Sequence, residues 1–124
     1  MKPRSFFQKL NLAQSGILTV IRTQTHMKVH LLCALIAILA GILFTISVVE
    51  WGLLLLSIFG VLTTECINTA IEHCVDLCCT EYSNAAKQAK DIASGAVLMM
   101  SIGAVCIGYL IFFKRIVTLV GGGD

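Results

Sequence analysis

The feature that most constrains this chain is a set of three long, largely apolar segments, over residues 29–49, 51–79 and 85–113. A helix needs about 20 mainly apolar residues to cross the hydrocarbon core of a bilayer. Of the 124 residues, 57% are hydrophobic and 13% are charged, whereas soluble domains carry about a quarter charged residues. The sequence therefore predicts a single all-α membrane domain, residues 1–124, in which three helices cross the bilayer.

The middle segment carries an unusual row of polar residues in its second half. It is purely apolar only from Trp51 to Leu62, which is too short to cross, so we expect the helix to continue to residue 79. At about 100° per residue, one narrow arc of that helix holds five polar residues: Glu65, Asn68, Thr69, Glu72 and Asp76. Ionisable groups beside a membrane segment are costly, and they indicate a functional site.

The segment before the first span is expected to form an amphipathic helix over residues 4–25. Its apolar residues Phe6, Leu10, Ala13 and Ile17 recur at steps of three and four, with basic residues off that stripe. Such a helix is suited to lie in the membrane interface beside anionic headgroups. The same stripe would equally allow the helix to pack on its own bundle, so both alternatives stay open.

The positions of the basic residues predict the orientation in the membrane. Five of them precede the first span and two lie between the second and third, whereas the first turn holds Glu50. The positive-inside rule then places the N-terminus and the acidic face in the cytoplasm of a multi-pass protein of the inner (plasma) membrane. Lys114 and Arg115 favour the opposite orientation. The net charge of +2 is too small to indicate a nucleic-acid partner.

The acidic face suits phosphoryl transfer when it is combined with the start of the third span, where Lys90 and Asp91 lie. Acids hold magnesium, a lysine neutralises phosphate charge, and one carboxylate accepts the proton of an attacking hydroxyl. Glu65 is the best candidate for that base, because it is the acid nearest the apolar region. By spacing alone, a structural role has about equal weight, in which the acids pair with Lys87, Lys90 and Arg22.

The same residues carry a specific resemblance to a known family. The pattern E-x-x-N-(S/T)-A-I-E-x-x-x-D is reproduced by Glu65, Asn68, Thr69, Ala70, Ile71, Glu72 and Asp76. Three further groups follow at matching spacing: Glu81–Tyr82, Ala89–Lys90–Asp91 and Gly95–Ala96–Val97–Leu98. Over almost its whole length, the chain therefore resembles the prokaryotic diacylglycerol kinase and undecaprenol kinase family.

The resemblance implies a small lipid kinase, typically a homotrimer with composite active sites between subunits. Such an enzyme transfers the γ-phosphate of ATP, with Mg²⁺, to the hydroxyl of diacylglycerol or undecaprenol in phospholipid or lipid-carrier recycling. It makes Glu65 the general base on the lipid hydroxyl, Asn68 its orienting neighbour and Ser94 a second contact to the lipid. It assigns the nucleotide to Glu72, Glu81, Tyr82, Ser83, Lys90 and Asp91, and the metal to Glu72 and the residue aligned at Gln24.

Two positions depart from the family pattern, which usually has a glutamate where this chain has Gln24 and a histidine where it has Ser83. A glutamine brings a carbonyl oxygen but no charge, so we expect magnesium to bind more weakly or to rely on the phosphates of ATP. A catalytically weakened family member is therefore one alternative. A small non-enzymatic membrane subunit or ion pathway, with the acids as relay or packing groups, is another.

The remaining polar residues have simpler interpretations. His26 and His30 share a helix face beside Lys28, and we attribute them to an interfacial position. A zinc site is weakly suggested by His73, Cys74, Cys78 and Cys79, but no second ligand pair follows at the required spacing.

Overall fold

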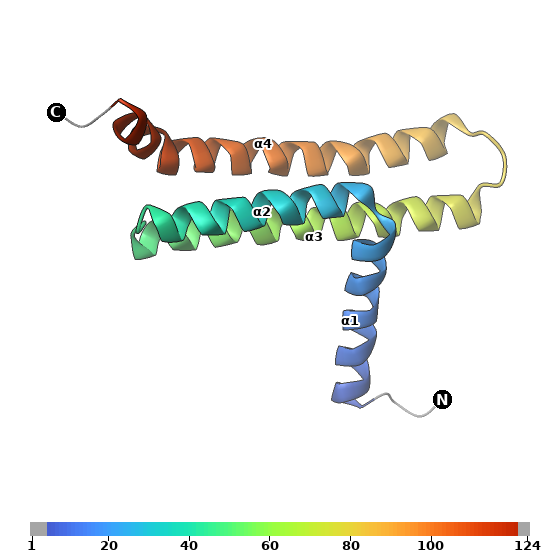
Figure 1. Ribbon diagram of the computed structural model, residues 1–124. Helices are drawn as coiled ribbons and strands as arrows, with labels where there is room; N and C mark the ends of the chain where they lie inside the picture. Colours follow the sequence, from blue (N-terminus) through green and yellow to red (C-terminus); the bar gives the residue numbers. More distant parts are fainter. Residues whose placement is uncertain (1–4, 122–124) are drawn as a thin grey trace.

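The structure of the chain is a computed structural model that describes residues 5–121, in which there are four helices. They are α1 (Phe6–Thr23), α2 (Thr25–Leu43), α3 (Val48–Cys78) and α4 (Asn84–Val120). Helices α2, α3 and α4 lie alongside one another, and α1 projects from the bundle at the start of α2 (Figure 1). The last three are long and apolar enough to cross a membrane, which confirms the predicted all-α membrane fold.

The helix ends differ from those predicted, because hydropathy marks membrane contact rather than helix limits. Helix α2 begins at Thr25 instead of residue 29 and ends at Leu43 instead of residue 49. Helix α4 continues to Val120, past the predicted end at residue 113, because Lys114 and Arg115 interrupt the apolar run without breaking the helix.

The turn between α2 and α3 accounts for the early end of α2. Thr45 has a φ of 46°, the left-handed conformation in which glycine usually ends a helix. Its N–H donates to the carbonyl of Ile42 and the N–H of Ile46 donates to that of Gly41, both at 3.2 Å. This pair of bonds is a Schellman motif, and the buried Ile46 side chain packs back over Gly41.

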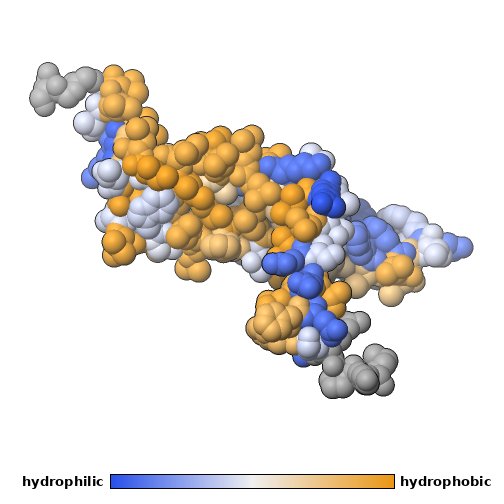
Figure 2. Space-filling view, turned by 60° about the horizontal axis from the view of Figure 1, so that its bottom comes forward, coloured by the Kyte–Doolittle hydropathy of each residue, from blue (hydrophilic) through white to orange (hydrophobic). Residues whose placement is uncertain are grey.

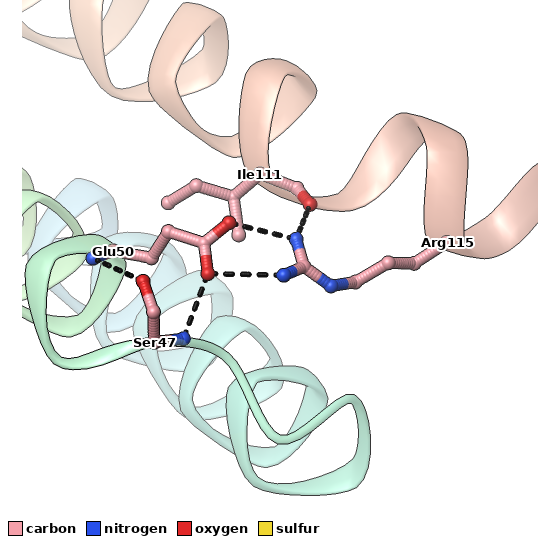
Figure 3. Close-up of polar contacts among 4 residues, drawn as sticks. All are labelled: Ser47, Glu50, Ile111 and Arg115. Atoms are coloured by element: carbon pink, nitrogen blue, oxygen red, sulfur yellow. Dashed lines mark hydrogen bonds and ion pairs between the residues drawn. The ribbon is translucent and has the colours of Figure 1, made fainter.

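A capping box and an ion pair fix the next residues of this turn. Ser47 caps α3 by accepting from the N–H of Glu50, and Glu50 Oε2 accepts from the N–H of Ser47 at 2.7 Å. Arg115 of α4 donates to the same carboxylate with both terminal nitrogens, at 2.8 and 3.0 Å, and also donates to the carbonyl of Ile111 (Figure 3). The α2–α3 turn is thus tied to the C-terminal part of α4.

Helix α1 begins with a capping box between Ser5 and Gln8 and is joined to α2 by Gln24 alone. Of its residues only Val20 is buried, while Phe6, Phe7 and Ile17 are at least half exposed. The bundle therefore does not cover the apolar stripe of α1. This favours the membrane interface over packing onto the chain's own bundle.

The surface divides by polarity along the bundle. Hydrophobic residues cover its middle, and hydrophilic residues gather at the α3–α4 connection and along α1 (Figure 2). Helix α3 has 31 residues and is about 46 Å long at about 1.5 Å per residue, whereas the hydrocarbon core is about 30 Å thick. The end of the α3–α4 hairpin therefore extends beyond the membrane, on the side where α1 joins α2 (Figure 1).

Candidate active site

The inner face of α3 changes from apolar to polar along its length. Leu54, Ser57 and Val61 are buried near its start, and Glu65, Asn68 and Thr69 are buried further along the same stripe. Glu65 is only 3% exposed, and Thr69 donates to its backbone carbonyl. A helical stripe that begins as core packing thus carries a carboxylate into the interior of the bundle.

Asn68 lies between this buried carboxylate and the next acid along the stripe. Its Nδ2 donates to Oε1 of Glu72, one turn away, at 3.2 Å. Its Oδ1 is buried and has no hydrogen-bond partner within residues 5–121. A buried polar atom without a partner is costly, so a hydrogen bond that a ligand donates to this oxygen would be favourable. The structure therefore brings Glu65, Asn68 and Glu72 onto one face, as the spacing predicts.

A hollow of about 350 Å³ lies at the end of the hairpin, where α3 leads into α4. Five of the six residues predicted to contact a nucleotide line it: Glu81, Tyr82, Ser83, Lys90 and Asp91. Asp76 of α3 and Lys87 of α4 lie on its walls. Residues on two helices and their connection thus meet around one polar hollow.

Two exposed ion pairs occupy the walls of this hollow. Lys90 Nζ lies 2.5 Å from Asp76 Oδ1, and Lys87 Nζ lies 2.6 Å from Asp91 Oδ2. Lys90 lies ahead of the apolar part of α4, and its hydrogen bond to Asp76 raises the pKa of its ammonium group. Exposed pairs of this kind contribute little to stability, so a phosphate can replace the carboxylate partner at little cost.

The other predicted site residues lie outside these contacts. Ser83 caps α4 by accepting from the N–H of Ala86, and Tyr82 is 81% exposed with its hydroxyl donating to Asn84. Ser94 is exposed on α4, and no hydrogen bond among residues 5–121 joins it to Glu65. Gln24 is half-buried at the junction of α1 and α2.

The donor set suits a magnesium ion that arrives with phosphate rather than a closed metal site. Within residues 5–121, no three His, Cys, Asp or Glu side chains gather around a common point. Asn68 binds one oxygen of Glu72, so the other carboxylate oxygen is available. Mg²⁺ in kinases typically uses one or two carboxylates with substrate phosphates and waters, and Glu72 fits that role.

The structure places one residue at the site that the sequence does not predict there. His30 of α2 is largely buried, and its Nε2 lies 4.0 Å from Oε2 of Glu65. His26, one turn earlier, is exposed. The interfacial position assigned to both histidines thus suits the exposed His26, whereas His30 lies beside Glu65. The sequence carries no signal for this contact, because the periodicity of α2 does not show which helix a given face meets.

Comparison with known proteins identifies the family. The family model of prokaryotic diacylglycerol kinase matches residues 11–112. The chain is 37% identical to an undecaprenol kinase of Bacillus subtilis over 111 residues, which cover 90% of each chain. It is 32% identical to a diacylglycerol kinase of Synechocystis sp. over 108 residues, 86% of this chain and 62% of the relative. A diacylglycerol kinase of Helicobacter pylori is 33% identical over 96 residues, 77% of this chain and 75% of the relative. The chain therefore belongs to the prokaryotic diacylglycerol kinase family.

Proposed function

We propose that this lipid kinase transfers the γ-phosphate of ATP, with Mg²⁺, to the hydroxyl of diacylglycerol or undecaprenol. The observation that carries the proposal is the continuity of one polar face. It begins at the buried Glu65, passes through Asn68 and Glu72, and ends at the hairpin hollow that holds Lys90. One end of this face suits a lipid hydroxyl, and the other suits a nucleotide.

The lipid end of the face requires a base at the depth of the headgroups. Glu65 lies 17 residues after the start of α3, about 26 Å along the helix and close to the thickness of the hydrocarbon core. A carboxylate oxygen of Glu65 accepts the proton of the lipid hydroxyl while the hydroxyl oxygen attacks the γ-phosphorus of ATP. The unpaired Oδ1 of Asn68 is suited to orient that hydroxyl.

The nucleotide end of the face holds the phosphates. Lys90 exchanges its weak pair with Asp76 for phosphate oxygens, while Glu81, Tyr82, Ser83 and Asp91 surround the rest of the nucleotide. Glu72, with the amide of Gln24, would hold Mg²⁺, which when bound neutralises charge on the β- and γ-phosphates.

Membrane side, assembly and pathway follow from the same proposal. The basic residues favour a cytoplasmic hairpin, where ATP is found. We further propose that three copies associate and that neighbouring subunits complete each site around the exposed Ser94. The product would return to phospholipid synthesis or to the lipid-carrier cycle.

The decisive experiment is transfer of labelled γ-phosphate from ATP to lipid by purified protein in mixed micelles. Diacylglycerol and undecaprenol are offered separately, with wild type beside Glu65→Gln. We expect one lipid to be labelled by the wild type, and a loss of at least about 100-fold in the variant, because general-base catalysis supplies 10²–10⁴-fold. Thermal unfolding checks that the variant folds. A folded wild type that labels neither lipid at high magnesium would refute the proposal.

A further inference from the structure

We propose that His30 receives the proton that Glu65 removes from the lipid hydroxyl and passes it to water. This inference rests on the proposed function, because it assigns a partner to the base of that reaction. It makes His30 a positioning and proton-accepting residue that acts through Glu65. The observation behind it is the approach of His30 Nε2 to Glu65 Oε2 at 4.0 Å, across the contact between α2 and α3.

The proton has to leave Glu65 in every turnover. When the lipid oxygen forms its bond to the γ-phosphorus, the bond between that phosphorus and the ADP oxygen breaks, and the hydroxyl proton passes to the carboxylate. The products are phosphorylated lipid, ADP and one proton. A protonated Glu65 cannot act as base again until this proton departs.

Burial makes direct release from Glu65 to water difficult. The Glu65 side chain is 4% exposed, whereas that of His30 is 21% exposed. A proton that moves from Glu65 to Nε2 of a neutral imidazole reaches a group that is more exposed at the surface of the bundle. The imidazolium then gives up a proton to water and returns to the neutral form. Imidazole suits this role because one ring nitrogen can accept a proton while the other carries one.

The distance fits a pair that closes during turnover. A hydrogen bond between these atoms requires about 2.7–3.2 Å, so the side chains must approach by about 1 Å. Hydrogen bonds at active sites are often long without substrate and tighten when it binds. Both residues belong to regular helices, so side-chain rotation alone can supply the movement.

The charged surroundings leave Glu65 as the direct partner of His30. From α3, Glu65 faces the imidazole, with the Cys66 thiol beside it and Glu72 two turns further along. From α1, the basic residue of the last turn is Arg22, which is exposed, and on α2 itself His26 and Lys28 are exposed. The charged side chains at the start of α4 pair with each other and with Asp76.

The test uses His30→Gln, which keeps a hydrogen-bonding side chain but cannot take up the proton, with His26→Gln as matched control. Multiple-turnover rates are measured beside the rate of the first turnover, because Glu65 has to lose its proton only before a second turnover. In multiple turnovers His30→Gln should be at least ten-fold slower than wild type and His26→Gln. Its first turnover and its KM for ATP should stay close to those of the wild type.

A purely structural role would give a different result. His30→Gln with an unchanged multiple-turnover rate, or with a first turnover slowed as much as the later ones, would overturn the inference. His30→Ala extends the test, since added imidazole should restore part of its rate in proportion to concentration. Absence of such rescue in a folded variant would also count against the inference.

A measurement without turnover separates this inference from the proposed function. In micelles, ¹⁵N spectra of the ring nitrogens should show His30 changing when Glu65 becomes Gln, while His26 and His73 do not. If the wild type transfers no phosphate but His30 responds, the proposed function fails and the pair stands. If His30 does not respond, the pair is absent and the inference fails, whatever the activity.

Discussion

At the scale of single residues, Glu65 shows how a costly group can be accommodated. A buried carboxylate is unfavourable unless neighbours compensate for its lost hydration. Here α2 places His30 beside the buried Glu65 carboxylate, with Nε2 at 4.0 Å from Oε2. The period of α3 was sufficient to predict that Glu65, Asn68 and Glu72 share a face. It could not predict His30, because periodicity assigns residues to a face but does not say which other helix that face meets.

Gln24 offers a residue-scale test of magnesium affinity. We expect Gln24→Glu to lower the magnesium concentration that gives half-maximal transfer by several fold, because a second carboxylate adds charge to the proposed metal site. The measurement is initial rate against free Mg²⁺ at fixed ATP. Gln14→Glu, on the exposed part of α1, is the control for added charge. An unchanged magnesium dependence would mean that Gln24 does not limit metal binding.

At the scale of elements, the α2–α3 turn illustrates what hydropathy could not predict. Three features occur within a few residues: the Schellman motif around Thr45, the capping box of Ser47 and Glu50, and the hydrogen bonds from Arg115 to Glu50. Hydropathy places residues 44–49 in the first span, because they continue its apolar character. A non-glycine residue in the left-handed conformation carried no signal that would have ended the helix there.

Thr45 should be replaceable with a gain in stability. Thr45→Gly removes a β-branched side chain from a left-handed position, and we expect the free energy of unfolding to rise by about 1 kcal/mol. Thr45→Val keeps the β-branch at the same φ and should give no gain. The measurement is reversible unfolding in micelles. A lower stability for the glycine variant would show that the turn is not strained at this residue.

The ion pair between Arg115 and Glu50 allows a second prediction about the helices. Arg115→Gln breaks both bonds to the carboxylate, so we expect the free energy of unfolding to fall. Lys114→Gln, at the neighbouring exposed position, removes the same charge and should change stability by less than about 0.5 kcal/mol. Equal losses in the two variants would assign the effect to net charge rather than to this contact.

At the scale of the whole molecule, the number and kind of helices followed from the sequence, but their mutual contacts did not. Apolar length predicted three spans, and the amphipathic period predicted α1. The absence of cover over the apolar side of α1 became evident only in three dimensions. Helix α4 shows a similar opening, since a Cβ atom added at Gly95 or Gly103 would meet no atom of the described residues within 4 Å.

The open face of α4 provides a test of assembly. If copies of the chain meet there, Gly103→Leu should shift the purified protein from trimer towards monomer, because the larger side chain prevents close helix contact. Val105→Leu, an exposed position on another side of the same helix, is the control. Mass measured in detergent across protein concentration gives the result. A wild type that stays monomeric throughout would contradict the proposed homotrimer.

The contact between Glu50 and Arg115 also bears on how the chain enters its membrane. In the proposed orientation, Arg115 must be carried across the bilayer, against the usual preference of basic residues for the cytoplasm. Glu50 comes before Arg115 in the chain by almost the whole α3–α4 hairpin, so its carboxylate is already on the far side of the membrane when α4 is translocated. The ion pair then neutralises Arg115, whereas Lys114 has no such partner among residues 5–121. A carboxylate at the start of α3 thus stabilises the membrane-spanning position of α4.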